Sequence, residues 1–230
     1  MTQLQILSIQ VGRPQQFDVE GAPAESWTSA IRKTAVSGAV HLGRTGLAGD
    51  EQADPVHHGG PDKAVLAYAA KHYETWNAEF PDLNFPAGGF GENLTVAGID
   101  ESGGCIGDTF RIGDCLLQIS QPRQPCWKLS RRWNFPQLAV LVQQNGRTGW
   151  YHRVLQEGVI EAGMALELVD RPFPDFSVAW ASSVMFARPK RSDDDLRLAA
   201  CPALSDAWRT TLENRAGRKI SASVELEEMS

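Results

Sequence analysis

Cys126 stands in a setting that could make a thiol reactive. It lies in the proline-rich run Ser120–Leu129 (SQPRQPCWKL), directly before a predicted helix. A helix N-terminus and nearby cations stabilise a thiolate, and Arg123 and Lys128 place positive charge on either side. A free cysteine is more often a small buried hydrophobic residue. The residues alone therefore leave an ionisable thiol and a core thiol as evenly matched alternatives.

Two glycine-rich segments could bind an anion. The first reads GLAGDE over Gly46–Glu51, and the second reads HHGGPDK over His57–Lys63. Glycines let backbone N–H groups approach an oxyanion, while a histidine and Lys63 would supply hydrogen bonds or charge. Within the first segment, Asp50 either orients His58 or caps a turn, and we favour the cap. A pair of tight turns without a ligand is the structural alternative.

A third segment, Gly88–Leu94 (GGFGENL), could form a backbone cradle in which Asn93 contacts a ligand. A flexible loop that enters a strand is the alternative. The chain contains no GxxxxGK[ST], GxGxxG, HExxH or GxSxG sequence. The standard nucleotide-binding, zinc-protease and α/β-hydrolase motifs are therefore excluded as explanations for these segments.

The amino-acid composition limits the classes of partner that the chain could bind. The 230 residues include 22 Lys and Arg against 28 Asp and Glu, a formal charge of −6, which argues against a nucleic acid polymer as partner. No signal peptide is recognisable, and no apolar run approaches the roughly 18 residues that span a membrane. We expect a cytoplasmic protein that binds no membrane. The four cysteines form no CxxC pair, so a zinc ribbon is not expected.

The first 170 residues carry short strand patterns. The clearest is a hairpin from Asp108 to Ser120 with a turn at Gly113-Asp114, and a second hairpin is predicted over Ser29–Leu42. Near the start, Leu7, Ile9 and Val11 alternate with polar residues, as on one face of a strand. Further strands are expected near residues 65–68, 93–96, 150–156, 159–161 and 165–169, with helices near 69–80, 127–133 and 136–144. Many short strands favour a β-barrel or a strongly bent sheet.

The last part of the chain is helical in pattern. The proline-rich run Arg171–Pro174 ends the strand pattern, and a first helix is expected over Phe176–Phe186. Ser192 and Ser205 are expected to cap the next two helices. We therefore predict a β-rich domain over residues 1–170 and a small three-helix domain over residues 175–230.

Taken together and in order, these segments resemble the MOSC family, which is named for the C-terminal domain of molybdenum cofactor sulfurase, and within it the bacterial YiiM group. The resemblance covers nearly the whole chain, including the helical tail. One departure is Ala53–His57, where the relatives have a more basic stretch. The matching segments are Ser29–Ile31, Gly46–Asp50, His58–Asp62, Gly91–Leu94, Gly107-Asp108, Ser120–Arg123, Pro125-Cys126 and Gly149-Trp150.

The resemblance implies a fold that is mainly β, a MOSC-type β-barrel with a few helices, and it implies a cofactor. The family binds the molybdenum cofactor, molybdopterin, and Cys126 matches the cysteine that supplies a thiolate to the metal. Thiolate is a soft ligand that suits this metal. The residues that would contact the cofactor are His58, Gly59, Gly60, Lys63, Gly91, Glu92, Asn93, Arg123 and Arg147.

The resemblance also implies an activity, the reduction of N-hydroxylated compounds such as the purine 6-hydroxylaminopurine. A separate electron-donating reductase is expected as partner, because the chain carries no flavin or nicotinamide fingerprint. A homodimer stays open. Two alternatives remain: a carrier of the cofactor or of sulfur without turnover, and a metal-free thiol enzyme in which Cys126 and His58 form a nucleophile–base pair.

Overall fold

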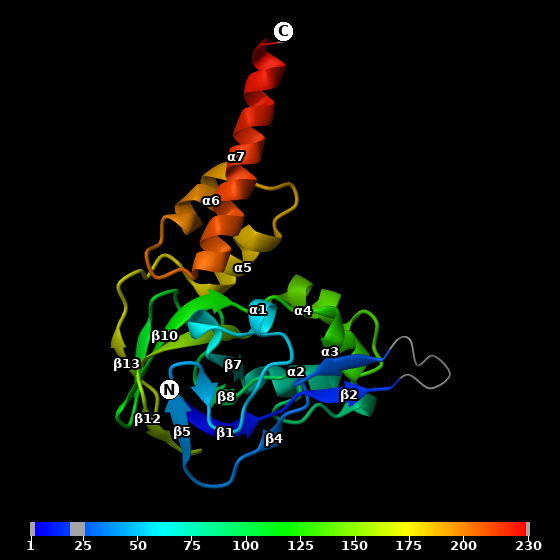
Figure 1. Ribbon diagram of the computed structural model, residues 1–230, viewed down its shortest axis with the longest axis vertical. Coiled ribbons are helices and arrows are strands. Elements are labelled where there is room, and N and C mark those ends of the chain that lie inside the picture. Colours follow the sequence, from blue (N-terminus) through cyan, green and yellow to red (C-terminus); the bar gives the residue numbers. More distant parts are fainter. Residues whose placement is uncertain (1–2, 19–25, 229–230) are drawn as a thin grey trace.

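The computed structural model describes residues 3–18 and 26–228, without the side chains of residues 56, 57 and 218–228 (Figure 1). Its centre is an eight-stranded sheet in the order β13-β9-β10-β11-β7-β8-β1-β4. Smaller sheets join β12, β5 and β6, and β2 with β3. The strands are β1 (Gln5–Val11), β2 (Gln15–Phe17), β3 (Trp27–Ser29), β4 (Thr34–Ala35), β5 (Val40–Gly43), β6 (Gly46–Leu47), β7 (Val65–Ala69), β8 (Leu94–Ala97), β9 (Thr109–Ile112), β10 (Cys115–Pro122), β11 (Trp150–Gln156), β12 (Gly158–Ile160) and β13 (Glu167–Asp170).

The large sheet curls back on itself. Gln5 in β1 bridges to Ala165, just before β13, although the two strands are far apart in the order of the sheet. The amide of Ile6 also donates to the carbonyl of Met164 at 2.9 Å. The result is the curled half-barrel that the strand pattern predicts.

Helices connect and cover the strands. α2 (Lys71–Glu79) links β7 to β8, the parallel pair in the sheet, and the Cys126 loop leads from β10 into α3. The other helical segments before the tail are α1 (Pro55–His58), η2 (Pro61–Lys63), η3 (Pro81–Leu83), α3 (Trp127–Arg132) and α4 (Leu138–Asn145). An aromatic cluster centred on Trp76, Tyr68 and Phe90 packs α2, α3 and α4 against β7.

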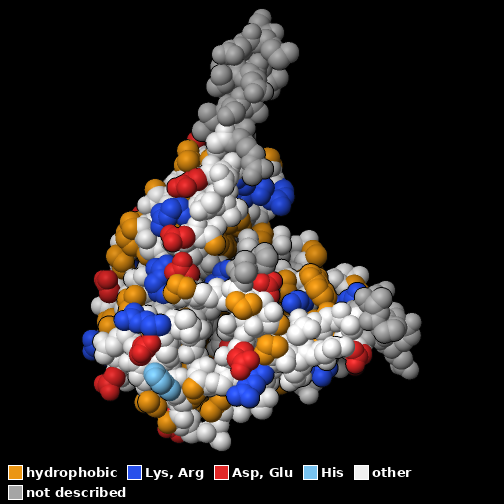
Figure 2. All heavy atoms as spheres, viewed as in Figure 1, with side chains coloured by type: hydrophobic (Ala, Val, Ile, Leu, Met, Phe, Trp, Pro, Cys, Tyr) orange, Lys and Arg blue, Asp and Glu red, His pale blue; other side chains and the backbone are white. Residues whose placement is uncertain are grey.

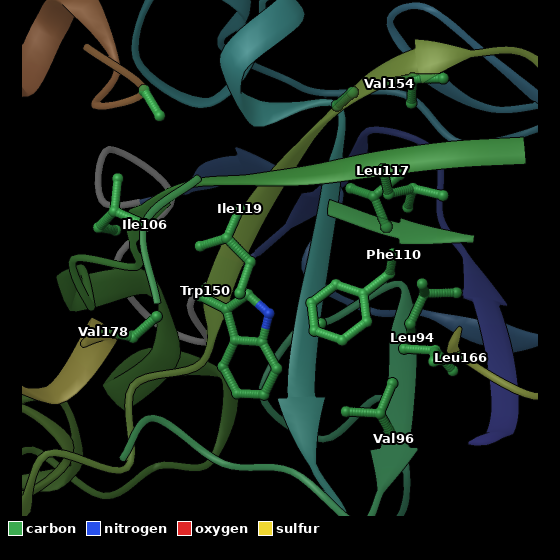
Figure 3. Close-up of a cluster of buried hydrophobic side chains, with 14 of the residues drawn as sticks. Leu94, Val96, Ile106, Phe110, Leu117, Ile119, Trp150, Val154, Leu166 and Val178 are labelled. Atoms are coloured by element: carbon green, nitrogen blue, oxygen red, sulfur yellow. The ribbon is translucent and has the colours of Figure 1, made fainter. Parts of the chain in front are cut away.

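The main core lies inside the curl. Trp150, Phe110 and Ile119 project into it from adjacent strands, and all are at most 1% exposed (Figure 3). The hairpin that carries two of these residues is the predicted one, since Cys115 pairs with Ile112 across the Gly113-Asp114 turn.

The C-terminal helices α5 (Val178–Phe186), α6 (Ser192–Ala199) and α7 (Asp206–Glu228) stand on one end of the half-barrel (Figure 1). Leu204, Trp208 and Leu212 are all buried, as their spacing predicts. These side chains belong to the same core cluster as the strands. The division at residues 170–175 stays a prediction, and the two parts share one core.

Three local predictions were wrong. The hairpin over residues 29–42 does not form, because β4 pairs with β1 while β5 pairs with β6 and β12. Leu7 is 46% exposed, since an irregularity in the register between Ile6 and Ser8 turns it away from the core. Ser192 is the first residue of α6 rather than its cap, which is Arg191.

Figure 2 shows the surface of the molecule in the view of Figure 1. Lys and Arg side chains are interspersed with Asp and Glu over the described residues, with no continuous basic stripe on this face. No helix in the described part of the chain is long and apolar enough to cross a membrane.

Candidate functional site

Two hollows meet at Cys126. The first, which we call the first cleft, encloses about 690 Å³ including its open mouth, and Lys33, Asp50, Gly91, Asn93 and Arg123 are among the residues that line it. The second, which we call the helix-side chamber, lies between the Cys126 loop and helices α5 and α7. Seven residues line both hollows: Asp54, His58, Lys63, Gln124, Cys126, Lys128 and Tyr151.

Cys126 is presented at the end of a short, fixed loop. The loop leaves β10 at Pro122, and the amide of Arg123 donates to the carbonyl of Gly149 at 3.0 Å, which ties the loop to the start of β11. Cys126 is the N-cap residue of α3, with extended backbone angles. Of the four cysteines it is the one that is not buried. The structure therefore places its thiol at the hollows rather than in the core.

Cations gather around this thiol. Arg123 is 5% exposed, and its Nη1 is buried without a hydrogen-bond partner. Lys63 and Lys128 line the same space, and the Nζ of Lys128 donates to the carbonyl of Thr28 at 3.0 Å. A buried donor without a partner is unfavourable, and an anionic or carbonyl oxygen is the group that a guanidinium N–H binds best.

Burial lowers the pKa of two groups that line both hollows. The pKa of His58 is lowered, first by burial and then by Lys128. Burial also lowers the pKa of Lys63, although Asp62 and Asp54 oppose the shift. His58 is therefore a neutral imidazole near pH 7, able to accept a proton or to pass one on.

A buried polar network forms the floor of the first cleft. Asp50 accepts hydrogen bonds from the amide of Gly12 at 2.7 Å, from Asn93 Nδ2 at 2.8 Å and from Lys33. Asn93 Oδ1 in turn accepts from the amide of Leu66 at 3.1 Å. Asp50 thus anchors the floor, and its hydrogen bonds do not go to His58.

Lys33 is the cleft residue that sequence reasoning missed. Burial lowers its pKa, against the raising effect of Asp50, with which it forms a buried ion pair. It lies in the segment for which the sequence predicts a hairpin over 29–42, and a hairpin gives this side chain no chemical role. Its neighbours Arg32 and Thr34 are polar too, so the local sequence does not set Lys33 apart.

The structure places Gly91 and Glu92 in different surroundings. Gly91 lines the first cleft with φ +82°, and a Cβ there would lie 3.0 Å from Ile31. Glu92 is fully buried away from the cleft, where it accepts from Thr95 Oγ1 at 2.9 Å and from Tyr73. Its carboxylate orders the loop, and Glu92 does not line either hollow.

Arg147 is likewise outside both hollows. Its guanidinium donates to both carboxylate oxygens of Glu79 at 2.9 and 2.8 Å and lies over the ring of Trp76. A partner 68 residues earlier in the chain holds it, and its contact with a cofactor stays a prediction. Gly59 and Gly60 shape the backbone between His58 and Lys63, with φ +96° at Gly60, and do not line the hollows.

Comparison with known proteins assigns this arrangement to a family. The MOSC domain model matches residues 54–167, which include the Cys126 loop, and the model of the YiiM-like 3-alpha helix domain matches residues 177–215. The chain belongs to the MOSC family, in its YiiM group. It is 38% identical to the protein YiiM of Escherichia coli over 95% of this chain and 94% of that protein.

Two further likenesses extend this result. The crystal structure of YiiM from Geobacillus stearothermophilus superposes with a TM-score of 0.78 at 38% identity, covering 93% of this chain and 99% of that one. A protein of Gibberella moniliformis named "Reductase" is 39% identical over 80% of this chain, which matches 32% of that longer protein. The MOSC fold with a YiiM-type helical tail is therefore shared along nearly the whole chain.

The donor set fits a cofactor that brings its own metal ligands. No group of three or more His, Cys, Asp or Glu side chains suited to a metal ion occurs among the described residues. Cys126 offers one soft sulfur at the junction of the hollows, and Arg123, whose buried Nη1 has no partner in the described protein, is among the residues that line the first cleft. One thiolate and a set of cations suit a metal already held by a phosphate-bearing organic ligand.

Proposed function

We propose that this chain is a molybdenum-cofactor-dependent oxidoreductase that reduces N-hydroxylated compounds, including purines such as 6-hydroxylaminopurine. The observation that carries the proposal is the place of Cys126, a thiol that is not buried and that lines both hollows beside Lys63 and Arg123. The YiiM relationship and the relative named "Reductase" support it.

The reaction is R–NH–OH + 2 e⁻ + 2 H⁺ → R–NH₂ + H₂O. The N–O bond breaks, nitrogen gains the electron pair and a proton, and the oxygen leaves as water after taking the second proton. The bound cofactor would supply two-electron chemistry at its metal. A separate reductase of the cell is proposed as the source of the electrons.

The residues of the chain hold the cofactor and handle protons. Cys126 provides the metal ligand, while Arg123 and Lys63 bind the cofactor's phosphate by charge-assisted hydrogen bonds. Gly91 lines the first cleft, where a Cβ would crowd the side chain of Ile31. His58, neutral near pH 7, relays a proton from solvent toward the leaving oxygen.

The test measures metal content and turnover on the same samples. Protein purified from cells that make the molybdenum cofactor is analysed for molybdenum per chain and assayed with 6-hydroxylaminopurine and a chemically reduced viologen dye as electron donor. Wild type should contain molybdenum and reduce the substrate, and Cys126→Ser should lose turnover and retain less molybdenum. Cys105→Ser is the matched control, because Ser can keep the hydrogen bond of Cys105 to the carbonyl of Pro174.

The outcomes distinguish the proposed reductase from the carrier and the metal-free thiol enzyme. Full metal content and turnover in Cys126→Ser would remove the ligand assignment. Cofactor bound by wild type without turnover of several N-hydroxylated compounds would indicate a carrier. A Cys126-dependent acyl or sulfur transfer by metal-free protein would indicate the thiol enzyme.

A further inference from the structure

A buried carboxylate, that of Glu101, has no part in the proposed reaction. Glu101 is 4% exposed and lies in a tight turn after β8, where Asp100 accepts hydrogen bonds from the amides of Ser102 at 2.8 Å and Gly103 at 3.0 Å. The carbonyl of Glu101 accepts the amide of Ala179 in α5 at 2.7 Å. The backbone on both sides of this carboxylate is therefore held in place.

Both oxygens of the Glu101 carboxylate are hydrogen-bonded. Its Oε1 accepts from the amide of Gly149 at 2.7 Å, and its Oε2 accepts from Nε2 of His72 in α2 at 2.7 Å. His72 is 7% exposed, so the whole group is buried. Replacing a buried pair of this kind by apolar side chains is often neutral or even stabilising. Because stability alone is a weak reason for a carboxylate here, the peptide group that it holds is informative.

Gly149 connects this carboxylate with the Cys126 loop. Its φ is +73°, and a Cβ there would lie 2.5 Å from the carbonyl oxygen of Ala67 in β7, so the position requires glycine. Its amide donates to Glu101, and its carbonyl accepts the amide of Arg123 at 3.0 Å. Glu101 thus holds Gly149 on its N–H side, and Gly149 holds the loop on its C=O side.

The amide of Arg123 is an important anchor because prolines lie on either side of it. Pro122 and Pro125 have no N–H group to donate. Cys126 follows three residues after Arg123, and Arg123 also carries the buried Nη1 that has no partner in the described protein. A shift of this backbone would move the thiol and the guanidinium together. Groups that bind a ligand jointly need to be held to within about 0.5 Å.

We propose that Glu101 is a positioning residue, which fixes the loop that carries Arg123 and Cys126 through the peptide of Gly149. His72 supports this role by holding the carboxylate in its orientation. Glu101 lines neither hollow, so it acts through the loop and not by contact with a ligand. The inference rests on the proposed function only in naming the cofactor as the ligand that the fixed loop serves.

Spin labelling of Cys126 tests the order of the loop in cofactor-free protein. A nitroxide methanethiosulfonate reagent should label Cys126 alone in the folded chain, because the other three cysteines are at most 4% exposed. Glu101→Met, of similar volume, leaves the amide of Gly149 without its acceptor and should shorten the rotational correlation time of the label about threefold. Glu101→Gln keeps an acceptor oxygen and should restore the wild-type spectrum.

Ile112→Ala is the control for a loss of stability without a change at the loop. Ile112 is 1% exposed in β9 and pairs with Cys115, at the end of β10 that lies opposite to the loop. The variant leaves a cavity and lowers the melting temperature, yet its label should move as in wild type. Labelling of the buried cysteines would reveal that Glu101→Met does not fold. His72→Leu then takes its place, with an expected shortening of about twofold.

Molybdenum per chain gives a second readout in loaded protein. Glu101→Met should retain about fivefold less molybdenum than Ile112→Ala, because its ligating groups are displaced. Glu101→Gln should retain as much as wild type. Wild-type label motion in Glu101→Met, or in His72→Leu where that variant replaces it, would overturn the inference, as would an equal change in Ile112→Ala. Label motion that depends on Glu101, in a protein that binds no molybdenum in any form, would instead contradict the proposed function and leave the positioning role standing.

Discussion

Arg123 is the residue whose surroundings best separate a binding role from a structural one. Its side chain is buried beside the cleft, yet its Nη1 has no partner within the described protein. An arginine that served only stability would have its buried N–H groups hydrogen-bonded, because burying an unpaired charge is unfavourable. The missing partner is therefore expected to come from a ligand.

We predict that Arg123→Met lowers cofactor retention about tenfold or more, through loss of a charge-assisted hydrogen bond. The cofactor-free variant should unfold at the same temperature as wild type or higher, because Met removes a buried, incompletely paired charge. Molybdenum per chain after gel filtration and a thermal melt measure the two effects. A large loss of thermal stability with unchanged retention would show that Arg123 serves the fold.

His152 gives the protein a defined pH dependence. It is 2% exposed among the core residues of β11, and burial lowers its pKa to about 3. The unfolded chain takes up a proton on this group below about pH 6.5, whereas the folded chain does not until about pH 3. Its contribution to stability is therefore fully present above pH 6.5 and is lost as the pH falls toward 3.

Between pH 7 and pH 5 this group should lower the free energy of unfolding by about 2 kcal/mol. Urea unfolding at both pH values measures it, and His152→Gln, which does not titrate, supplies the comparison. The variant should lose that part of the pH dependence. An equal dependence in both proteins would mean that His152 titrates in the folded chain as it does in the unfolded chain.

Several elements were predictable because local pattern and tertiary structure agree. The hairpin of β9 and β10 has a two-residue turn between apolar strands, and the tail helices follow the spacing of their buried residues. The segment 29–42 could not be predicted, because β4 and β5 pair with strands far away in the sequence. For the same reason the sequence did not indicate the ion pair of Lys33 with Asp50, or the contact of Arg147 with Glu79 of α2.

A buried ion pair joins the tail helices. Asp195 of α6 is 1% exposed and pairs with Arg215 of α7, which also donates to the carbonyls of Met185 at 2.8 Å and Val184 at 3.0 Å in α5. Removing one member of a buried pair leaves the other charge uncompensated. This pair therefore fixes all three helices at one point.

We predict that Asp195→Ala lowers the free energy of unfolding by about 3 kcal/mol. The double variant Asp195→Ala with Arg215→Met should recover part of that loss, because no charge is then left unpaired. Asp193→Ala, on the exposed side of the same helix, should change stability by about 0.5 kcal/mol or less. Equal effects of Asp195→Ala and Asp193→Ala in urea unfolding would contradict the account.

Over the whole molecule, the half-barrel and the tail share one core. Ile106 donates its amide to the carbonyl of Phe176 at 2.8 Å, and Val178 donates to the carbonyl of Gly104 at 2.8 Å. Val178 and Ile106 are both fully buried in the same cluster. The helices are therefore part of the folding unit as well as a wall of the chamber.

We predict that a chain ending at Arg171 does not fold, because these backbone groups and apolar side chains become uncovered. The full chain should show a single calorimetric unfolding transition. Expression of the shortened chain and a thermal melt of the soluble fraction provide the measurement. A soluble shortened chain with cooperative unfolding would show that the half-barrel is independent of its tail.

The account depends most on Cys126 as a ligand of the cofactor's metal. X-ray absorption at the molybdenum edge counts the sulfur neighbours of the metal in loaded protein, and Cys126→Ser reconstituted with the same cofactor provides the comparison. We predict one sulfur neighbour fewer in the variant, replaced by a lighter atom. An identical sulfur shell in both proteins would contradict the central claim.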